Sequence, residues 1–131
     1  RQVWLRQKGE AARRPLDLVV ALNESGRYKE AARKATALIE QAPDLAEAFN
    51  QRAIALYCLG RYDESICDCR RTLEINPYHF GAAAGMGQCY VQQDNLHAAL
   101  EAFRHALAIN PNLEGIRANV NYLERSLKRN T

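Results

Sequence analysis

Four cysteines are the side chains of this sequence best suited to metal binding or redox chemistry: Cys58, Cys67, Cys69 and Cys89. Cys67 and Cys69 stand two residues apart within a helical pattern, so their thiols point in different directions and make a poor pair of zinc ligands. Cys69 and Cys89 fall at apolar positions, which favours small core residues. We expect structural thiols, with metal binding and redox chemistry as alternatives, and unpaired thiols favour a reducing compartment.

Three histidines are the remaining candidates for acid–base or metal chemistry: His79, His97 and His105. They fall in different parts of the repeat described below, and none recurs together with a carboxylate. The sequence also lacks a HExxH motif, a glycine-rich phosphate loop and a nucleophile elbow. We therefore expect no enzyme activity, no cofactor and no metal site.

A fixed period organises the chain. Three prolines stand 34 residues apart: Pro43, Pro77 and Pro111. The turn Gly26-Arg27-Tyr28 recurs 34 residues later at Gly60-Arg61-Tyr62, whereas Asp94 replaces the glycine in the third copy. Glycine allows the positive φ that ends a first helix, and proline cannot continue a second one. The period predicts a stacked array of helical hairpins, whose long surface is usually its functional part.

The repeat resembles the tetratricopeptide repeat (TPR) pattern over about residues 12–113. In the third unit the matching residues are Met86-Gly87, Tyr90, Ala99, Phe103 and Pro111. In the middle unit they are Phe49, Arg52-Ala53, Leu56, Ser65, Cys69 and Pro77, and in the first Pro15, Leu18-Val19, Leu22, Ala31, Ala35 and Pro43. The resemblance implies an all-α, right-handed solenoid of TPR hairpins, and it specifies the fold far more than the ligand.

The expected elements follow from this alignment. Helix pairs are predicted at 14–25 and 28–41, at 46–59 and 62–75, and at 80–93 and 96–109. The units are an N-terminal extension at 1–11, three repeats at 12–45, 46–79 and 80–113, and a C-terminal capping helix at 114–131. The cap is indicated by four apolar residues at helical spacing: Ile116, Val120, Leu123 and Leu127.

The N-terminal extension contains the only tryptophan, Trp4, between Val3 and Leu5. This apolar cluster either caps the first repeat or docks into a groove of its own chain or of a second copy, so a homo-oligomer is a candidate assembly. Small bacterial TPR proteins are similar in having a Trp-rich leader and a segment like residues 76–82. Because the chain begins with Arg1, we expect a fragment; the compartment stays open, with the cytoplasm favoured and the periplasm possible if a leader was removed.

The charge balance argues against some partners. A net charge of +3 is too small to indicate a nucleic-acid or membrane partner. Arg70-Arg71 and Arg104-His105 lie one period apart and predict a basic stripe on the outer helices. We interpret the stripe as a solvated face, with a phosphate-binding strip as the alternative, because no aromatic residues alternate with it to stack on bases.

Arg52 and Asp68 form a polar pair that the resemblance singles out. Arg52 stands where the family usually has leucine, so its stem should face the hairpin interior, and Asp68 lies sixteen residues later on the partner helix. Arg and Asp are similarly placed in the middle repeat of co-chaperone TPR domains. We expect a half-buried structural ion pair across this hairpin.

The resemblance also implies a site, because the first helix of each TPR hairpin lines the concave face of the array. The expected peptide-binding groove comprises Leu16, Val20, Asn23, Asn50, Gln51, Ile54, Tyr57, Gln88, Val91, Gln92, Asn119 and Tyr122. The apolar members offer area for buried side chains, and the amides offer hydrogen bonds to a peptide backbone. Aromatic anchors such as Tyr57 and Tyr122 are the expected hot spots.

A clamp for acidic chaperone tails is the best-known ligand site of the family, and it requires Lys, Asn, Asn, Lys and Arg. The matching positions here are Leu16, Val20, Gln51, Gly81 and Gly85, so no cation remains to bind a carboxylate. We therefore predict a scaffold or adaptor that binds a protein or peptide partner in an apolar, amide-lined groove. The alternatives are a self-assembling unit that uses the Trp4 segment and the repeat ends, and a chaperone-tail adaptor.

Overall fold

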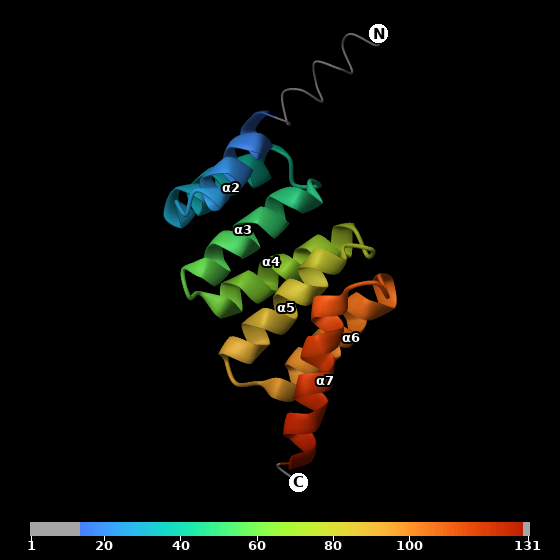
Figure 1. The fold of residues 1–131 in the computed structure, drawn as a ribbon. Helices are drawn as coiled ribbons and strands as arrows, with labels where there is room; N and C mark the ends of the chain where they lie inside the picture. Colours follow the sequence, from blue (N-terminus) through green and yellow to red (C-terminus); the bar gives the residue numbers. More distant parts are fainter. Residues whose placement is uncertain (1–13, 130–131) are drawn as a thin grey trace.

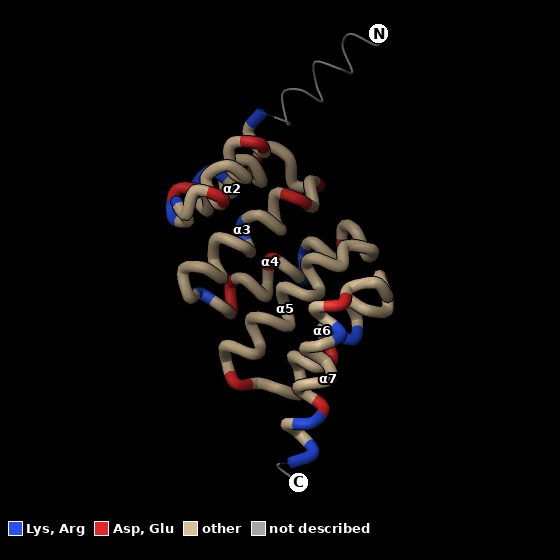
Figure 2. Tube along the Cα trace, in the orientation of Figure 1, with Lys and Arg blue, Asp and Glu red and all other residues tan. Residues whose placement is uncertain are grey.

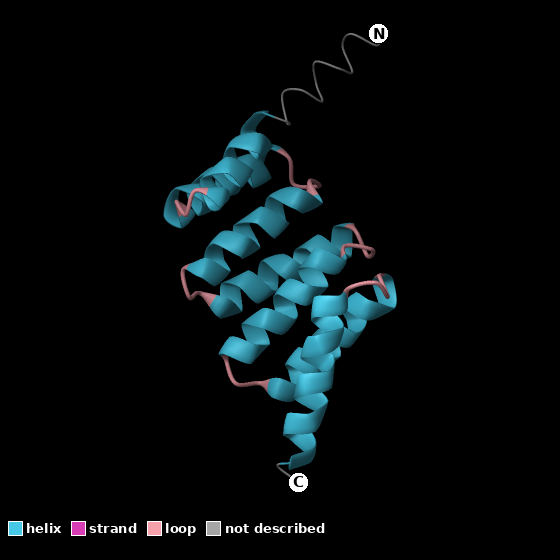
Figure 3. Cartoon of the chain, viewed as in Figure 1, coloured by secondary structure: helices cyan, strands magenta, loops and turns pink. Residues whose placement is uncertain are grey.

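The structure is a computed structural model that describes residues 14–129, and all of this part is built from helices joined by turns (Figure 1; Figure 3). Residues 14–24 are helical, and six further helices follow: α2 (Tyr28–Gln41), α3 (Ala46–Cys58), α4 (Tyr62–Ile75), α5 (Phe80–Gln92), α6 (Leu96–Ile109) and α7 (Glu114–Arg129). Consecutive helices pack as antiparallel pairs, and α3 also contacts α5. The expected all-α solenoid of hairpins is confirmed, and the Trp4 segment lies outside the described residues.

The turns explain where the first helix of each hairpin ends. Gly26 and Gly60 adopt φ of 78° and 79°, in the left-handed region that glycine enters without strain. Asp94 takes the same place in the third hairpin with φ of 57°. Short polar side chains tolerate this conformation better than most, which is why the turn survives the loss of its glycine. These helices end one residue earlier than predicted, because the residue before each turn already leaves the helix.

Small residues allow the two helices of each hairpin to approach closely. Ala31, Ser65 and Ala99 share one slot of the repeat, and all three are buried. The hydroxyl of Ser65 donates to the carbonyl oxygen of Ala53 across the α3–α4 interface at 2.7 Å, so the buried polar group is satisfied.

The last helix ends the array with a polar face. Val120 and Leu123 are buried against α6, as the sequence predicts for a cap. Arg117, Asn121 and Glu124 stand in the slots where α3 and α5 have core residues, and Glu124 instead pairs with Arg104 of α6. Polar residues at these positions keep the outer side of α7 compatible with water.

Candidate functional site

A cleft of about 370 Å³ opens between α3 and α5 on the concave side of the array. Ile54 and Tyr57 form its α3 wall, and the opposite wall is low because α5 contributes Gly81, Ala84 and Gly85. Cys69 of α4 lies in its floor. The cleft is therefore an apolar hollow whose size results from small residues on α5.

A second cleft of about 460 Å³ continues the first toward the C-terminal end, between α5 and α7. Tyr57 and Gln88 line both clefts, so the two form one groove along the concave face. Its rim holds three large apolar side chains that are exposed: Ile54, Val91 and Tyr122. Figure 2 shows that α5, which separates the clefts, has no charged residue.

Eight of the twelve predicted groove residues line these two clefts: Asn50, Ile54, Tyr57, Gln88, Val91, Gln92, Asn119 and Tyr122. The other four lie toward the N-terminal end. Leu16 and Val20 are half-buried on helical residues 14–24. Asn23 does not face a ligand, because it is buried with only 8% of its surface exposed, and Gln51 lies over it.

A network of hydrogen bonds connects the concave residues of all three repeats. The Asn23 amide donates to the Gln51 backbone oxygen at 3.0 Å and to Gln51 Oε1 at 2.9 Å. Gln51 and Asn50 in turn donate to Glu47 Oε2 at 2.9 and 3.0 Å. The Ala82 N–H donates to His79 Nδ1, so the proton of the neutral ring is on Nε2. This Nε2–H donates to Glu47 Oε1, with 3.0 Å between nitrogen and oxygen.

Glu47 is the centre of this network. Partial burial raises the pKa of its carboxyl, but the hydrogen bonds from His79, Gln51 and Asn50 outweigh burial, and the net effect lowers the pKa. The carboxylate is therefore ionised at neutral pH and held in one place on the concave wall.

The lowered pKa predicts how the network depends on pH. A carboxyl whose folded pKa lies below its unfolded value stabilises the fold above that unfolded value, and the stabilisation is lost as pH falls through the folded pKa. Glu47→Gln should therefore lower the unfolding free energy at pH 7, and the gap to wild type should narrow below pH 4.5. Urea unfolding between pH 7 and pH 3 measures this. Glu40→Gln, an exposed site on α2, should show almost no gap, and a pH-independent gap for Glu47→Gln would contradict the assignment.

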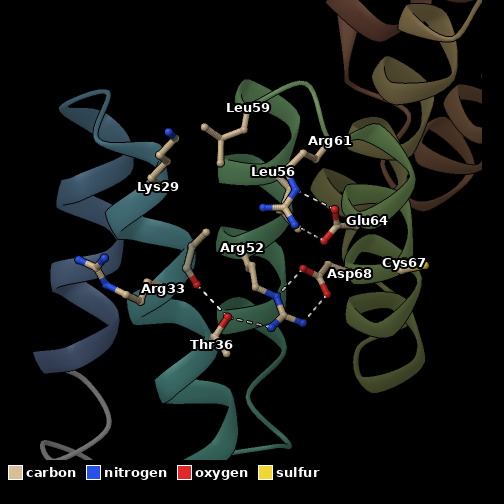
Figure 4. A pocket seen from close by; sticks show the side chains of 11 residues that line it. Lys29, Arg33, Thr36, Arg52, Leu56, Leu59, Arg61, Glu64, Cys67 and Asp68 are labelled. Atoms are coloured by element: carbon tan, nitrogen blue, oxygen red, sulfur yellow. Dashed lines mark hydrogen bonds and ion pairs between the residues drawn. The ribbon is translucent and has the colours of Figure 1, made fainter.

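Arg52 and Asp68 meet on the opposite, convex side, where they border a hollow of about 640 Å³ between α2, α3 and α4 (Figure 4). Arg52 Nε and Nη2 donate to the two Asp68 oxygens at 2.7 and 2.8 Å, and Nη1 donates to Thr36 Oγ1 at 3.1 Å. The Arg52 side chain thus links three helices. It belongs to the scaffold behind the groove and not to the groove itself.

The expectation of structural thiols fits two of the four cysteines, because Cys58 and Cys67 are exposed on the helix surfaces. Cys69 and Cys89 are buried, and burial raises the pKa of Cys69 to about 12, so this thiol is not a nucleophile at neutral pH. Arg70 of the convex stripe donates to the Tyr90 hydroxyl, and Arg104 pairs with Glu124. Residues 14–129 hold no His, Cys, Asp and Glu cluster suited to a metal ion, and no helix among them has the length and apolarity to cross a membrane.

Glu47 and His79 are the site residues that the sequence did not single out together. They stand 32 residues apart, so their pairing does not follow the 34-residue period. The available signal was the position of His79 directly before a helix, where a side-chain acceptor caps the first turn. That position fixes the His79 tautomer with the proton on Nε2. Only the packing of α5 against α3 brings Glu47 within hydrogen-bond distance of this nitrogen.

Known sequences and structures similar to this chain agree on one fold. A family model described as tetratricopeptide repeat matches residues 44–112. A TPR repeat-containing protein of Rhizobium etli is 35% identical over 88 residues, which cover 67% of this chain and 43% of that protein. The SGT1 homolog of Bos taurus is 36% identical over 75 residues, or 57% of this chain and 22% of that protein. The chain thus spans less than half the length of these relatives.

Two solved structures illustrate the likeness. The first TPR domain of Spaghetti (RPAP3), bound to the HSP90 peptide SRMEEVD, has a TM-score of 0.84 at 19% identity, covering 89% of this chain and 93% of that one. The Yersinia enterocolitica type III secretion chaperone SycD, in complex with a peptide of the translocator YopD, has a TM-score of 0.83 at 16% identity, covering 92% and 95%. At these identities the structures establish the fold alone.

Proposed function

The chain belongs to the tetratricopeptide repeat family, and from that premise we propose that it is an interaction module that binds a peptide segment of a partner protein in its concave groove. The observation that carries this proposal is the continuous pair of clefts, with Ile54, Val91 and Tyr122 exposed on rigid helices along it. Exposed apolar side chains around a preformed hollow are typical of peptide-binding surfaces. Relatives of the same fold hold a peptide of HSP90 or of YopD, which supports the class of ligand.

An acidic chaperone tail is the less favoured ligand. Charge-assisted bonds to carboxylates need Lys or Arg, and neither of the two clefts is lined by one. The likeness of the Arg52–Asp68 hairpin to co-chaperones does not alter this, because both residues lie on the convex side.

Self-assembly is the second candidate function, and one observation favours it. Leu18 is 46% exposed at the N-terminal end of the array. It borders a hollow whose lining is part apolar and part polar: Pro15, Ala37, Leu38, Arg14, Lys34 and Gln41. A second copy covering this end would bury these apolar side chains. Sedimentation over a range of concentrations distinguishes the candidates, because only self-assembly makes the mass of the isolated chain concentration-dependent.

Ile54→Arg tests the groove. We expect peptides that wild type selects from a random displayed library to bind this variant at least about tenfold more weakly, because a charge replaces apolar contact area worth more than about 1.4 kcal/mol. Ile54 is 39% exposed, so the fold should persist, which circular dichroism checks.

Leu18→Arg is the matched control, since it places the same charge at a similarly exposed apolar site outside the groove. It should leave peptide binding unchanged. If the selected peptides bind both variants as well as they bind wild type, the concave groove is not the functional site.

A further inference from the structure

On the N-terminal side of the first cleft, the concave wall presents a fixed anion, the Glu47 carboxylate, next to Asn50. Asn50 and Gln51 each direct an amide N–H to Glu47 Oε2, and His79 directs its Nε2–H to Oε1. Asn50 is half-buried and also lines the first cleft, beside this carboxylate. A ligand that reaches this wall meets the Glu47 carboxylate, whose side chain is 38% exposed.

Further acids continue this wall on helical residues 14–24. Asp17 occupies the slot that Gln51 and Gly85 occupy in the later repeats, and Glu24 occupies the slot of Cys58 and Gln92. Both acids are exposed. By slot and exposure, Asp17 and Glu24 therefore extend the acidic wall of Glu47 on the N-terminal side of the first cleft.

Cations are scarce along the groove. Within residues 14–129, neither concave cleft is lined by Lys or Arg. Arg125 of α7 shares the slot of Tyr57, but it stands at the C-terminal end of the array, beyond both repeats that form the first cleft. A ligand that lies from helical residues 14–24 to α5 thus passes acids first and an uncharged helix next.

The cleft between α3 and α5 selects for an apolar side chain. Gly81 and Gly85 keep the α5 wall low, and a Cβ added at Gly85 would lie 3.4 Å from the Cys69 sulfur. The floor is therefore within contact distance of the wall, and the hollow of about 370 Å³ is shaped for a bulky aliphatic or aromatic group.

From these observations we propose that the groove binds a basic peptide segment, with a Lys or Arg side chain at Glu47, Asp17 and Glu24 and a bulky apolar residue in the cleft between α3 and α5. The proposal rests on the proposed function, because it specifies the ligand of the same groove. Opposite charge raises both the association rate and the selectivity of such a surface.

A random dodecamer display library tests the charge of the ligand. Selection on immobilised wild-type protein should enrich peptides in which Lys and Arg outnumber Asp and Glu and which share one large apolar residue. Binding of the enriched peptides should weaken as salt rises. Enrichment of acidic or uncharged peptides would overturn the basic-ligand proposal and leave the groove assignment standing. No enrichment, or equal binding to Ile54→Arg, would overturn the groove assignment itself.

Two double variants then locate the charges. Asp17→Asn/Glu24→Gln should weaken the best selected peptide by roughly fivefold, as expected for two partly exposed ion pairs. Glu40→Gln/Glu101→Gln removes the same charge from exposed sites on the outer helices α2 and α6 and should leave the affinity unchanged. If both double variants weaken peptide binding equally, the effect comes from the net charge of the protein, and Asp17 and Glu24 make no specific contact with the ligand.

Gly85→Leu tests the apolar anchor. The added side chain would occupy the cleft from its α5 wall and should abolish binding of the selected peptides, while circular dichroism shows whether the helices persist. Unchanged binding would show that no ligand side chain enters this cleft.

Discussion

Gly87→Ala should be among the most destabilising single methyl additions in this chain. A Cβ at this position would lie 2.5, 2.6 and 2.8 Å from three ring atoms of Phe103, closer than carbon atoms approach in proteins. Phe103 is 1% exposed and cannot swing into solvent. Adding a methyl group to a packed interface costs about 1–3 kcal/mol, and here α5 and α6 must separate to admit it.

The same substitution at a neighbouring glycine should not lower the stability of the fold. At Gly85, two residues earlier on the same helix, an added Cβ would meet only the Cys69 sulfur at 3.4 Å. Alanine is favoured over glycine in a helix by about 0.5–1 kcal/mol, so Gly85→Ala should be neutral or stabilising. Thermal unfolding should show Gly87→Ala melting several degrees lower than Gly85→Ala.

The clash arises because two facing positions of each hairpin share a fixed volume, and the three repeats divide it differently. The two slots that meet between the helices of each hairpin hold Val19 with Ala35, Ala53 with Cys69, and Gly87 with Phe103. One residue grows as its partner shrinks, as a close-packed interior requires. Gly87→Ala/Phe103→Cys copies the pair of the middle repeat and should cost less than the sum of the two single variants. Strict additivity would contradict this shared volume.

The sequence predicts these helices well because each boundary has a local cause. The second helix of each hairpin ends before a proline: Pro43, Pro77 or Pro111. In the first two hairpins, the first helix ends at a turn glycine, Gly26 or Gly60. The 34-residue alignment then places buried and exposed slots without any tertiary information. The residues that line the concave clefts were predictable where they occupy the same slot in successive repeats.

The polar network was not predictable in the same way. Whether Asn23 turns inward under Gln51 depends on side-chain rotamers, which residue type and slot do not determine. Asn23 shares its slot with Tyr57 and Val91, both at the groove, so its burial is a property of its neighbours. Glu47 likewise becomes the centre of a network only because two donors of its own helix and His79, the residue before α5, converge on it.

Asp68→Ala should destabilise the chain far more than its exposed counterpart, Glu64→Ala. Both carboxylates accept two hydrogen bonds from one arginine, at 2.7 and 2.8 Å in each pair (Figure 4). They differ in burial, because the Asp68 side chain is 8% exposed and that of Glu64 55%. An exposed i,i+3 pair contributes less than about 0.5 kcal/mol.

The larger cost at Asp68 arises from the cation it leaves behind. Arg52 would keep its bond to Thr36 but lose its counter-ion while three quarters of its side chain stays buried. Removing one partner of a buried pair costs roughly 3–5 kcal/mol, and the partial exposure of Arg52 places this case near 3. Urea unfolding of the two alanine variants measures the difference, and equal stabilities would show that burial of the pair has no energetic consequence.

The third repeat suggests a variant that distinguishes two costs: the loss of the ion pair itself, and the burial of an unpaired Arg52 charge. Met86 and Ala102 stand in the slots of Arg52 and Asp68. Arg52→Met/Asp68→Ala removes both charges and installs a pair that the same fold already accommodates. Because apolar replacements of buried ion pairs are often neutral or stabilising, the double variant should recover most of the stability that Asp68→Ala loses. If it stays as unstable as the single variant, the ion pair itself stabilises this hairpin beyond what packing can replace.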